Sequence, residues 1–193
     1  MLPQDWIGPA IVAATIAALV TVLGWFVASK REVGRDRRRR RERERDVQTA
    51  LRAEIQHYVD ALSDPEYDPM VVWKDVVALM EADAEYVPMI PSERNDAVFQ
   101  ALIGDISILP EPVIGPVVRY YNQVFAIDAL ITDLRNDGFR ALSQSQRIGL
   151  YTDYISLKLE ARRMGNEATD GLSRSLANLN GVSSPGAARS DRS

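Results

Sequence analysis

The longest hydrophobic stretch of the chain lies near its amino end and contains no charge. Between Asp5 and Lys30 the sequence reads WIGPAIVAATIAALVTVLGWFVAS. A helix of about 20 apolar residues is long enough to span the hydrocarbon core of a bilayer. The pattern therefore predicts a single membrane-spanning helix over residues 7–28. The expected membrane-spanning and boundary positions include Trp6, Ile7, Ala10, Ala14, Ala18, Trp25 and Ala28.

The predicted anchor has one competing interpretation and one additional feature. A cleaved signal peptide begins with basic residues and has an apolar core of about 7 to 15 residues. This stretch follows Asp5 and is longer, so an anchor is favoured. Ala10, Ala14 and Ala18 recur at every fourth position, a spacing that lets two membrane helices approach closely. The same spacing also arises simply because alanine is common in such helices.

Basic residues gather directly after the predicted span. Residues 30–46 contain ten basic and five acidic residues. Because Lys and Arg remain on the cytoplasmic side, the amino end is expected outside and residues 30–193 in the cytoplasm, in a bacterial inner membrane. The expected lipid- or charge-contacting residues are Lys30, Arg31, Arg35, Arg37, Arg38, Arg39, Arg40 and Arg41. In one interpretation these residues bind anionic lipid. In the other they determine the membrane topology and form a solvent-exposed helix, in which acidic residues four positions away interact with the basic ones.

Beyond residue 46 the hydrophobic positions recur at helical spacing. The first seam consists of Val47, Leu51, Ile55, Tyr58 and Leu62. Asp68 followed by Pro69 predicts the start of a second helix, because Asp caps helices and Pro is tolerated in the first turn. The inward stripe of this second helix is Trp73, Val76, Val77 and Met80. A short third helix is expected to be capped by Ser92, with Ala97, Val98, Ala101 and Leu102 inward.

Two longer helical seams follow. The first consists of Val113, Val117, Tyr120, Val124, Ile127, Ile131 and Leu134, and the second begins with Leu150, Tyr154 and Leu157. Pro116 is expected to kink or delay the first of these helices, and Gly138 to end it in the left-handed conformation. Ser143 and Gln146 form a capping box for the second helix, whose pattern continues through Gly165. A short connection between two long helices predicts an antiparallel hairpin.

The complete pattern predicts an all-α protein with four parts. These are a transmembrane anchor over residues 1–29, an Arg-rich juxtamembrane helix over residues 30–46, a cytoplasmic helical domain over residues 47–181 and a disordered tail over residues 182–193. The anchor helix continues into the charged helix, and the domain is a small bundle built on the antiparallel hairpin. Because the seams have coiled-coil spacing, part of the apolar surface is expected to pair with another chain.

Composition narrows the possible classes of function. The chain has no cysteine, which excludes disulfides, thiol catalysis and cysteine metal sites. Residues 47–193 carry 13 basic and 21 acidic residues, so the domain is a poor candidate for binding nucleic acid. The phosphate-binding patterns GxGxxG and GxxxxGK[ST] do not occur.

Two acidic motifs have metal-site spacing but are incomplete. Glu54 and His57 match the Glu-x-x-His pattern of di-iron bundles, which requires two such pairs, and His57 is the only histidine. Asp64 and Asp68 fit the first and fifth positions of a calcium loop, but Pro69 stands where glycine is required. Turn and cap roles are therefore favoured for these acids. Catalysis by two carboxylates remains open, because acids are plentiful, although no pair stands out.

The sequence thus predicts a non-enzymatic protein with no metal and no cofactor. The two long helices carry four tyrosines, namely Tyr120, Tyr121, Tyr151 and Tyr154. They either line a pocket or contact a partner, or they pack in the core, as their spacing favours. The leading hypothesis is a membrane-anchored interaction or scaffold module on the cytoplasmic face, which binds a partner protein or itself. In the alternative hypothesis the Arg-rich segment binds anionic lipid or nucleic acid, and the helical domain regulates that contact.

Overall fold

The structure is a computed structural model and describes residues 35–182. The predicted span over residues 7–28, Lys30, Arg31 and the tail after residue 182 lie outside the described residues. None of the helices within residues 35–182 is long and apolar enough to cross a membrane. The chain divides into two compact units, with the boundary after Arg43.

The first unit is described over residues 35–43, which are helical and exposed throughout. The side chains of Arg38 and Glu42 form an ion pair of 2.9 Å across one helical turn. Both side chains remain largely in solvent, so this pair contributes at most a few tenths of a kcal/mol, roughly, to helix stability. The remaining predicted charge-contacting residues of this segment are exposed as well, and they are Arg35, Arg37, Arg39, Arg40 and Arg41.

Every regular element described in the second unit is helical, which confirms the predicted all-α class for this part of the chain. The part of the first helix that belongs to this unit covers residues 44–61. It is followed by η2 (Pro65–Tyr67), α2 (Pro69–Ala82), α3 (Ala97–Leu102), η3 (Ile103–Ile108), α4 (Glu111–Leu134), α5 (Asp137–Ala141) and α6 (Gln144–Val182).

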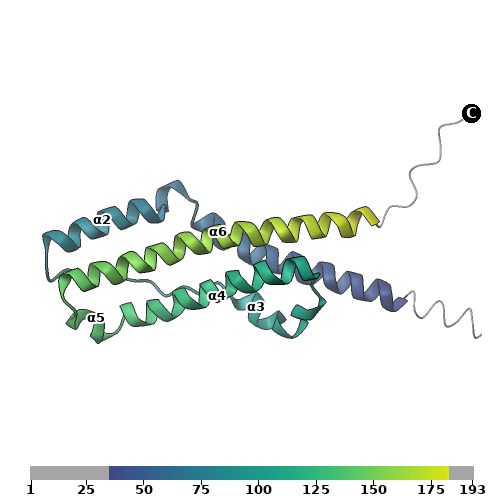
Figure 1. Cartoon of the computed structure of the whole chain (residues 1–193), viewed down its shortest axis with the longest axis horizontal. Coiled ribbons are helices and arrows are strands. Elements are labelled where there is room, and N and C mark those ends of the chain that lie inside the picture. Colours follow the sequence, from purple (N-terminus) through teal and green to yellow (C-terminus); the bar gives the residue numbers. More distant parts are fainter. Residues whose placement is uncertain (1–34, 183–193) are drawn as a thin grey trace, which may run out of the picture. The chain divides into compact units, whose positions relative to one another are not determined.

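The long helix α6 is the element on which the other helices pack. Both α2 and α4 lie against it, and Figure 1 shows them along different sides of α6. The chain direction reverses between α4 and α6. Near the start of α4, Arg119 lies 3.9 Å from Glu167, and further along α4 the side-chain amide of Gln123 donates to the carbonyl of Leu157 at 3.0 Å.

Local sequence signals set several helix starts as predicted. The Asp68 carboxylate accepts a hydrogen bond from the backbone N–H of Met70, and Pro69 occupies the first position of α2. At the start of α6, the backbone N–H of Ser143 donates to the side chain of Gln146 at 3.1 Å. The N–H of Gln146 donates back to the Ser143 hydroxyl at 3.4 Å, which completes the predicted capping box.

Two local predictions differ from the structure. The delay predicted at Pro116 is not found, because α4 begins at Glu111, five residues upstream. The alternative, a kink at Pro116, stays a prediction. Gly138 does not close α4 in a left-handed conformation: none of the described glycines has a positive φ, and Gly138 lies inside α5. Asn136 caps this short helix by accepting from the N–H of Phe139. The Asn-Asp-Gly sequence therefore follows the end of α4 at Leu134, as predicted, but also starts α5.

The third helix also differs from its prediction. It begins at Ala97 with Asp96 at its cap position, not after Ser92. Phe99 is its buried residue, whereas Ala97 and Ala101 are exposed. The inward face was misassigned because the large aromatic ring, and not the small residues, fills the space next to Tyr121, with ring centroids 3.9 Å apart.

The core is built from the seams of three helices. The buried residues of α4 are Val113, Val117, Tyr120, Tyr121, Val124, Ile127, Ile131 and Leu134. On α6 Tyr154 is buried, while Leu150 and Leu157 are half-buried at the margin of the core. The helix over residues 44–61 contributes Val47, Leu51, Ile55, Tyr58 and Val59. These residues lie in a single hydrophobic cluster.

The first turn of α6 also holds the end of α2. The side-chain amide of Gln144 donates to the carbonyl of Met80 at 2.6 Å, and the guanidinium of Arg147 donates to the carbonyls of Ala84 and Arg140. Arg147 is only 6% exposed. Its buried charge faces carbonyls at the carboxyl ends of α2 and α5, where the helix dipoles are negative.

Candidate functional site

A segment without helix or strand connects α2 to α3 over residues 86–96, and we call it the strap. Its prolines, Pro88 and Pro91, restrict the residues before them to extended conformations. Ile90 is 6% exposed and anchors the strap in the core, whereas its neighbour Met89 is 94% exposed. The strap therefore has one face in the protein and one in solvent, and it carries Glu93 inward.

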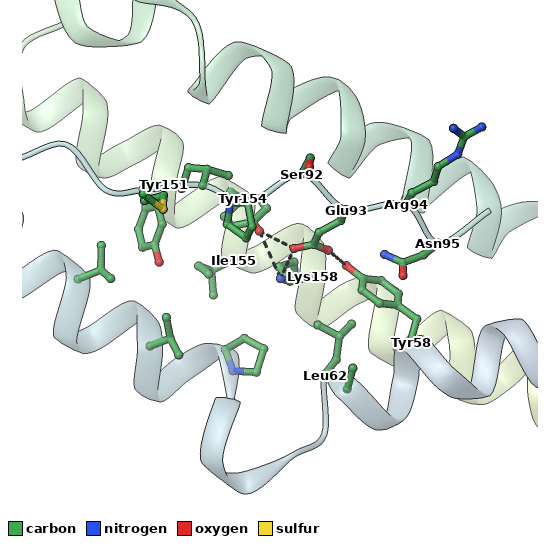
Figure 2. Close-up of a pocket in the computed structure, with 17 residues that line it drawn as sticks. Tyr58, Leu62, Ser92, Glu93, Arg94, Asn95, Tyr151, Tyr154, Ile155 and Lys158 are labelled. Atoms are coloured by element: carbon green, nitrogen blue, oxygen red, sulfur yellow. Dashed lines mark hydrogen bonds and ion pairs between the residues drawn. The ribbon is translucent and has the colours of Figure 1, made fainter. Parts of the chain in front are cut away.

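The Glu93 carboxylate is the centre of a polar cluster formed with Tyr58, Tyr154 and Lys158. One oxygen, Oε2, accepts from the Tyr58 hydroxyl at 2.6 Å. The other, Oε1, accepts from the Tyr154 hydroxyl at 2.9 Å and from the Lys158 ammonium at 2.7 Å. Lys158 also donates to the Tyr154 hydroxyl at 3.2 Å. Figure 2 shows Glu93 turned toward these three side chains, while Arg94 points away from them.

The ionisation states of this cluster follow from burial and from one ion pair. The side chains of Glu93 and Lys158 are each 16% exposed. Burial alone raises the pKa of the Glu93 carboxyl, but the charge and hydrogen bonds of Lys158 and the two tyrosine hydroxyls outweigh it, so the pKa is lowered. Burial and the charge of Glu93 raise the pKa of both Tyr58 and Tyr154. At neutral pH the cluster holds one anion, one cation and two neutral hydroxyls.

A pocket of about 570 Å³ opens beside this polar cluster. Its walls come from four segments: the end of the first helix, α2, the strap and α6. Most of the lining is apolar and includes Leu62, Pro69, Val72, Val76, Ile90 and Ile155. Tyr151 also lines it, and burial and the neighbouring Tyr86 raise the pKa of the Tyr151 hydroxyl to about 12. A second pocket of about 390 Å³ lies between the strap and α4.

A second carboxylate, Glu54, has a structural role that the sequence did not reveal. It accepts from the backbone N–H groups of Val98 and Phe99 at 2.6 and 3.0 Å, and from the Tyr121 hydroxyl at 2.7 Å. Glu54 therefore caps α3 from another helix, while His57 is exposed. Within residues 35–182, no group of three or more His, Asp or Glu side chains is arranged to hold a metal.

The acids of the calcium-like motif are used in turns. The Asp64 carboxylate accepts from the N–H of Glu66 at 2.9 Å, and Asp68 caps α2. Both contacts are the turn and cap roles favoured from the sequence.

The polar cluster combines residues that the sequence pattern does not connect. Tyr58 and Tyr154 belong to the predicted seams, but Glu93 and Lys158 were not singled out. Glu93 lies in the strap, which has no periodicity, and it is 65 residues from Lys158. The available signal was weak: Lys158 is one of three lysines in the chain, and it lies one turn after Tyr154.

Comparison with known proteins gives no assignment. No family model, no curated protein and no solved structure matches the chain. The fold and the pocket define the second unit as an all-helical bundle with a mostly apolar cavity. Beside this cavity lies the polar cluster, in which the charges of Glu93 and Lys158 sum to zero.

Proposed function

We propose that this protein is a membrane-anchored helical module that self-associates through the outer face of α2. In this proposal residues 7–28 span the membrane, the amino end lies outside and the helical domain is cytoplasmic. The anchor restricts neighbouring copies to one plane, which raises their effective concentration. The recurring Ala10, Ala14 and Ala18 would let the anchors of two copies pack closely.

The observation that carries the proposal is that α2 is apolar on all sides. Only Lys74, Asp75 and Glu81 among its 14 residues are charged or polar. One side of α2 packs on α6 and buries Val77 and Met80. Large apolar side chains are exposed around the rest of the helix. Val71, at 55%, lies on the side away from α6, and Met70 at 47% and Leu79 at 50% lie on its two opposite flanks. A helix that is hydrophobic all round is normally covered all round.

The charges on this face favour a second copy of the chain as the partner. Lys74 and Glu81 are exposed and seven residues apart, so they lie two turns apart along the same flank of α2. In an antiparallel pair of α2 helices about a two-fold axis near Ala78, Lys74 of each copy meets Glu81 of the other. The Lys74 and Glu81 flank is therefore self-complementary, as an isologous dimer interface requires; the exposed Asp75 lies on the other flank and has no counterpart in this pairing. The small side chain of Ala78 allows close approach at the axis.

Charge reversal provides the test. Lys74→Glu and Glu81→Lys each place like charges opposite one another, so each is expected to weaken self-association. The double swap restores opposite charges and is expected to restore it. Because the chain has no cysteine, Ala78→Cys introduces the only thiol, and oxidative cross-linking of the full chain in membranes measures pairing. Asp133→Cys, exposed on α4, is the matched control and is expected not to cross-link.

Two outcomes would overturn the proposed self-association. The first is an absence of Ala78→Cys cross-links in intact membranes. The second is a double swap that cross-links no better than either single reversal. Capture of a different protein by this face, with no pairing of copies, would assign α2 to a heterologous partner instead.

A second candidate function rests on the exposure of the arginines between residues 35 and 43. In this proposal the segment binds anionic lipid, since each basic residue near a charged surface contributes about 1 kcal/mol. In vesicles that hold the full chain, binding of this segment to anionic headgroups is then salt-sensitive. Neutralising Arg37 to Arg41 with glutamine is expected to remove that salt dependence, and unchanged binding would exclude this function.

A further inference from the structure

The pocket between α2, the strap and α6 has the size and lining of a small-molecule site. Its volume of about 570 Å³ falls within the range of roughly 300 to 1,000 Å³ that is typical of ligand pockets. Figure 2 shows the polar cluster of Glu93, Tyr58, Tyr154 and Lys158 at one part of the pocket, next to the polar strap residues Ser92, Arg94 and Asn95. Most of the remaining lining is apolar. The shape calls for a ligand with an apolar body and one polar end.

The polar cluster determines which charge that ligand carries. The Glu93 carboxylate and the Lys158 ammonium are 2.7 Å apart and neutralise one another. Two tyrosine hydroxyls complete the cluster. A charged ligand would lose its hydration in the pocket and find no opposite charge in the cluster that is not already paired. The other charged residue of the lining, Arg94, points away from the cluster and lies 3.9 Å from Asp96. Such a loss of hydration is strongly unfavourable, so the site favours an uncharged ligand.

The remaining hydrogen-bonding capacity specifies the head group. An ammonium has three donors, and Lys158 uses two of them on Glu93 and Tyr154 among the described residues. The Glu93 oxygen Oε2 accepts one hydrogen bond, from Tyr58, and a carboxylate oxygen can accept two. The cluster thus has one donor and one acceptor left, on two residues that line the pocket. A hydroxyl or a carboxamide offers the complementary pair.

We propose that this pocket binds an uncharged amphiphile, an aliphatic chain that ends in a hydroxyl or a carboxamide. The chain packs against Leu62, Val76 and Ile155, and the head group donates to Glu93 and accepts from Lys158. Each additional buried methylene strengthens binding by about fourfold until the pocket is full. The site does not depend on self-association through α2, because it lies on the opposite, inward side of that helix.

The test uses the full chain in phospholipid nanodiscs, since non-ionic detergents are themselves uncharged amphiphiles. The probe is a decanol analogue with a photoreactive diazirine in its chain, and labelled peptides are identified by mass spectrometry. Labelling is expected on the α2 and α6 peptides that line the pocket. 1-Decanol is expected to compete, whereas decanoate and decylammonium compete about tenfold more weakly or worse. Equal competition by decanoate, or labelling that avoids these peptides, would overturn the proposal.

A matched pair of variants separates pocket binding from surface adsorption. Val72 lines the pocket and Val118 on α4 does not, although both are 37% exposed. Val72→Trp fills the mouth of the pocket and is expected to abolish competable labelling. Val118→Trp adds the same ring at equal exposure and is expected to leave labelling unchanged. Equal labelling in both variants would contradict the proposed site.

Charge substitution in the cluster gives the sharpest outcome. Glu93→Gln leaves Lys158 without a carboxylate, so decanoate is expected to become the preferred competitor over 1-decanol. Lys158→Met leaves the carboxylate alone, and decylammonium is expected to become preferred. A purely structural role for these residues predicts loss of binding without exchange of the preferred ligand. The circular dichroism spectrum of each variant must match that of the parent protein. A change of the preferred ligand in either variant then supports the proposal, and no change in both variants overturns it.

Discussion

Gly165 of α6 lies directly against Val59 of the first helix. A Cβ atom added at Gly165 would overlap the Val59 side chain and lie 3.1 Å from the Tyr120 ring. Alanine is normally favoured over glycine inside a helix by about 1 kcal/mol. Here the steric conflict is expected to dominate, so Gly165→Ala should lower the free energy of unfolding by about 1 to 3 kcal/mol. Chemical denaturation of the full chain, followed by circular dichroism, measures this change.

The same helix supplies the control. At Gly171 an added Cβ meets no atom within 4 Å, so Gly171→Ala should stabilise the protein by about 0.5 to 1 kcal/mol. Combining Gly165→Ala with Val59→Ala removes the overlapping methyl and should cost less than the two single changes added together. A stabilising effect of Gly165→Ala alone would show that the two helices do not approach closely.

Tyr120 and Tyr121 are neighbours whose hydroxyls have opposite surroundings. The Tyr120 hydroxyl is buried without a hydrogen-bond partner among the described residues, whereas the Tyr121 hydroxyl donates to Glu54 at 2.7 Å. Removing an unpaired buried hydroxyl is nearly neutral or stabilising, while a hydrogen bond to a charged group contributes about 1.5 to 3 kcal/mol. Tyr120→Phe should therefore preserve or raise the midpoint of denaturation, and Tyr121→Phe should lower it. Equal losses in both variants would contradict this assignment.

Sequence reasoning succeeded where a feature depends on neighbours in the chain. The Asp68 cap, the Ser143 capping box and the uninterrupted course of α6 through Gly165 all follow from residues within a few turns. The start of α3 was misassigned because the carboxylate that caps it, Glu54, comes from a helix more than 40 residues away.

The pocket could not be predicted from the sequence, for the same physical reason. Glu93 lies in a segment with no hydrophobic period, and its partners are supplied by the first helix and by α6. Nothing in the local sequence distinguishes Lys158 on α6 from an exposed lysine. Only the packing of the strap against both helices brings these charges together.

Arg147 is expected to be the most sensitive arginine of the bundle. Its guanidinium donates to the carbonyls of Ala84 and Arg140 and is 6% exposed. Arg147→Met leaves these acceptors without the donor and should cost about 2 to 4 kcal/mol of stability. Arg119→Met removes a side chain that is 57% exposed and should change stability by less than about 0.5 kcal/mol. Thermal denaturation of the two variants under one condition measures the contrast, and equal effects would refute it.

The pH dependence of stability should report the Glu93–Lys158 pair. Because the pKa of Glu93 in the folded protein lies below its ordinary value of 4.5, the folded state binds fewer protons than the unfolded state in this range. The resulting stability is present above about pH 4.5 and is lost as the pH falls through the lowered pKa. Glu93→Gln should remove this part of the acid sensitivity, measured as the free energy of unfolding between pH 6 and pH 3, roughly the window in which carboxylates titrate.

Lys158→Met should reverse the sign of that pH dependence. Without the ammonium, burial becomes the dominant influence and raises the pKa of Glu93 above 4.5. The folded state then binds more protons than the unfolded state, so protonation stabilises it as the pH falls through the raised pKa. Two comparisons measure the sign. On acidification, Lys158→Met should gain stability relative to the double variant Lys158→Met/Glu93→Gln. The parent protein should instead lose stability relative to Glu93→Gln. The same sign in both comparisons would show that Lys158 does not set the ionisation of Glu93.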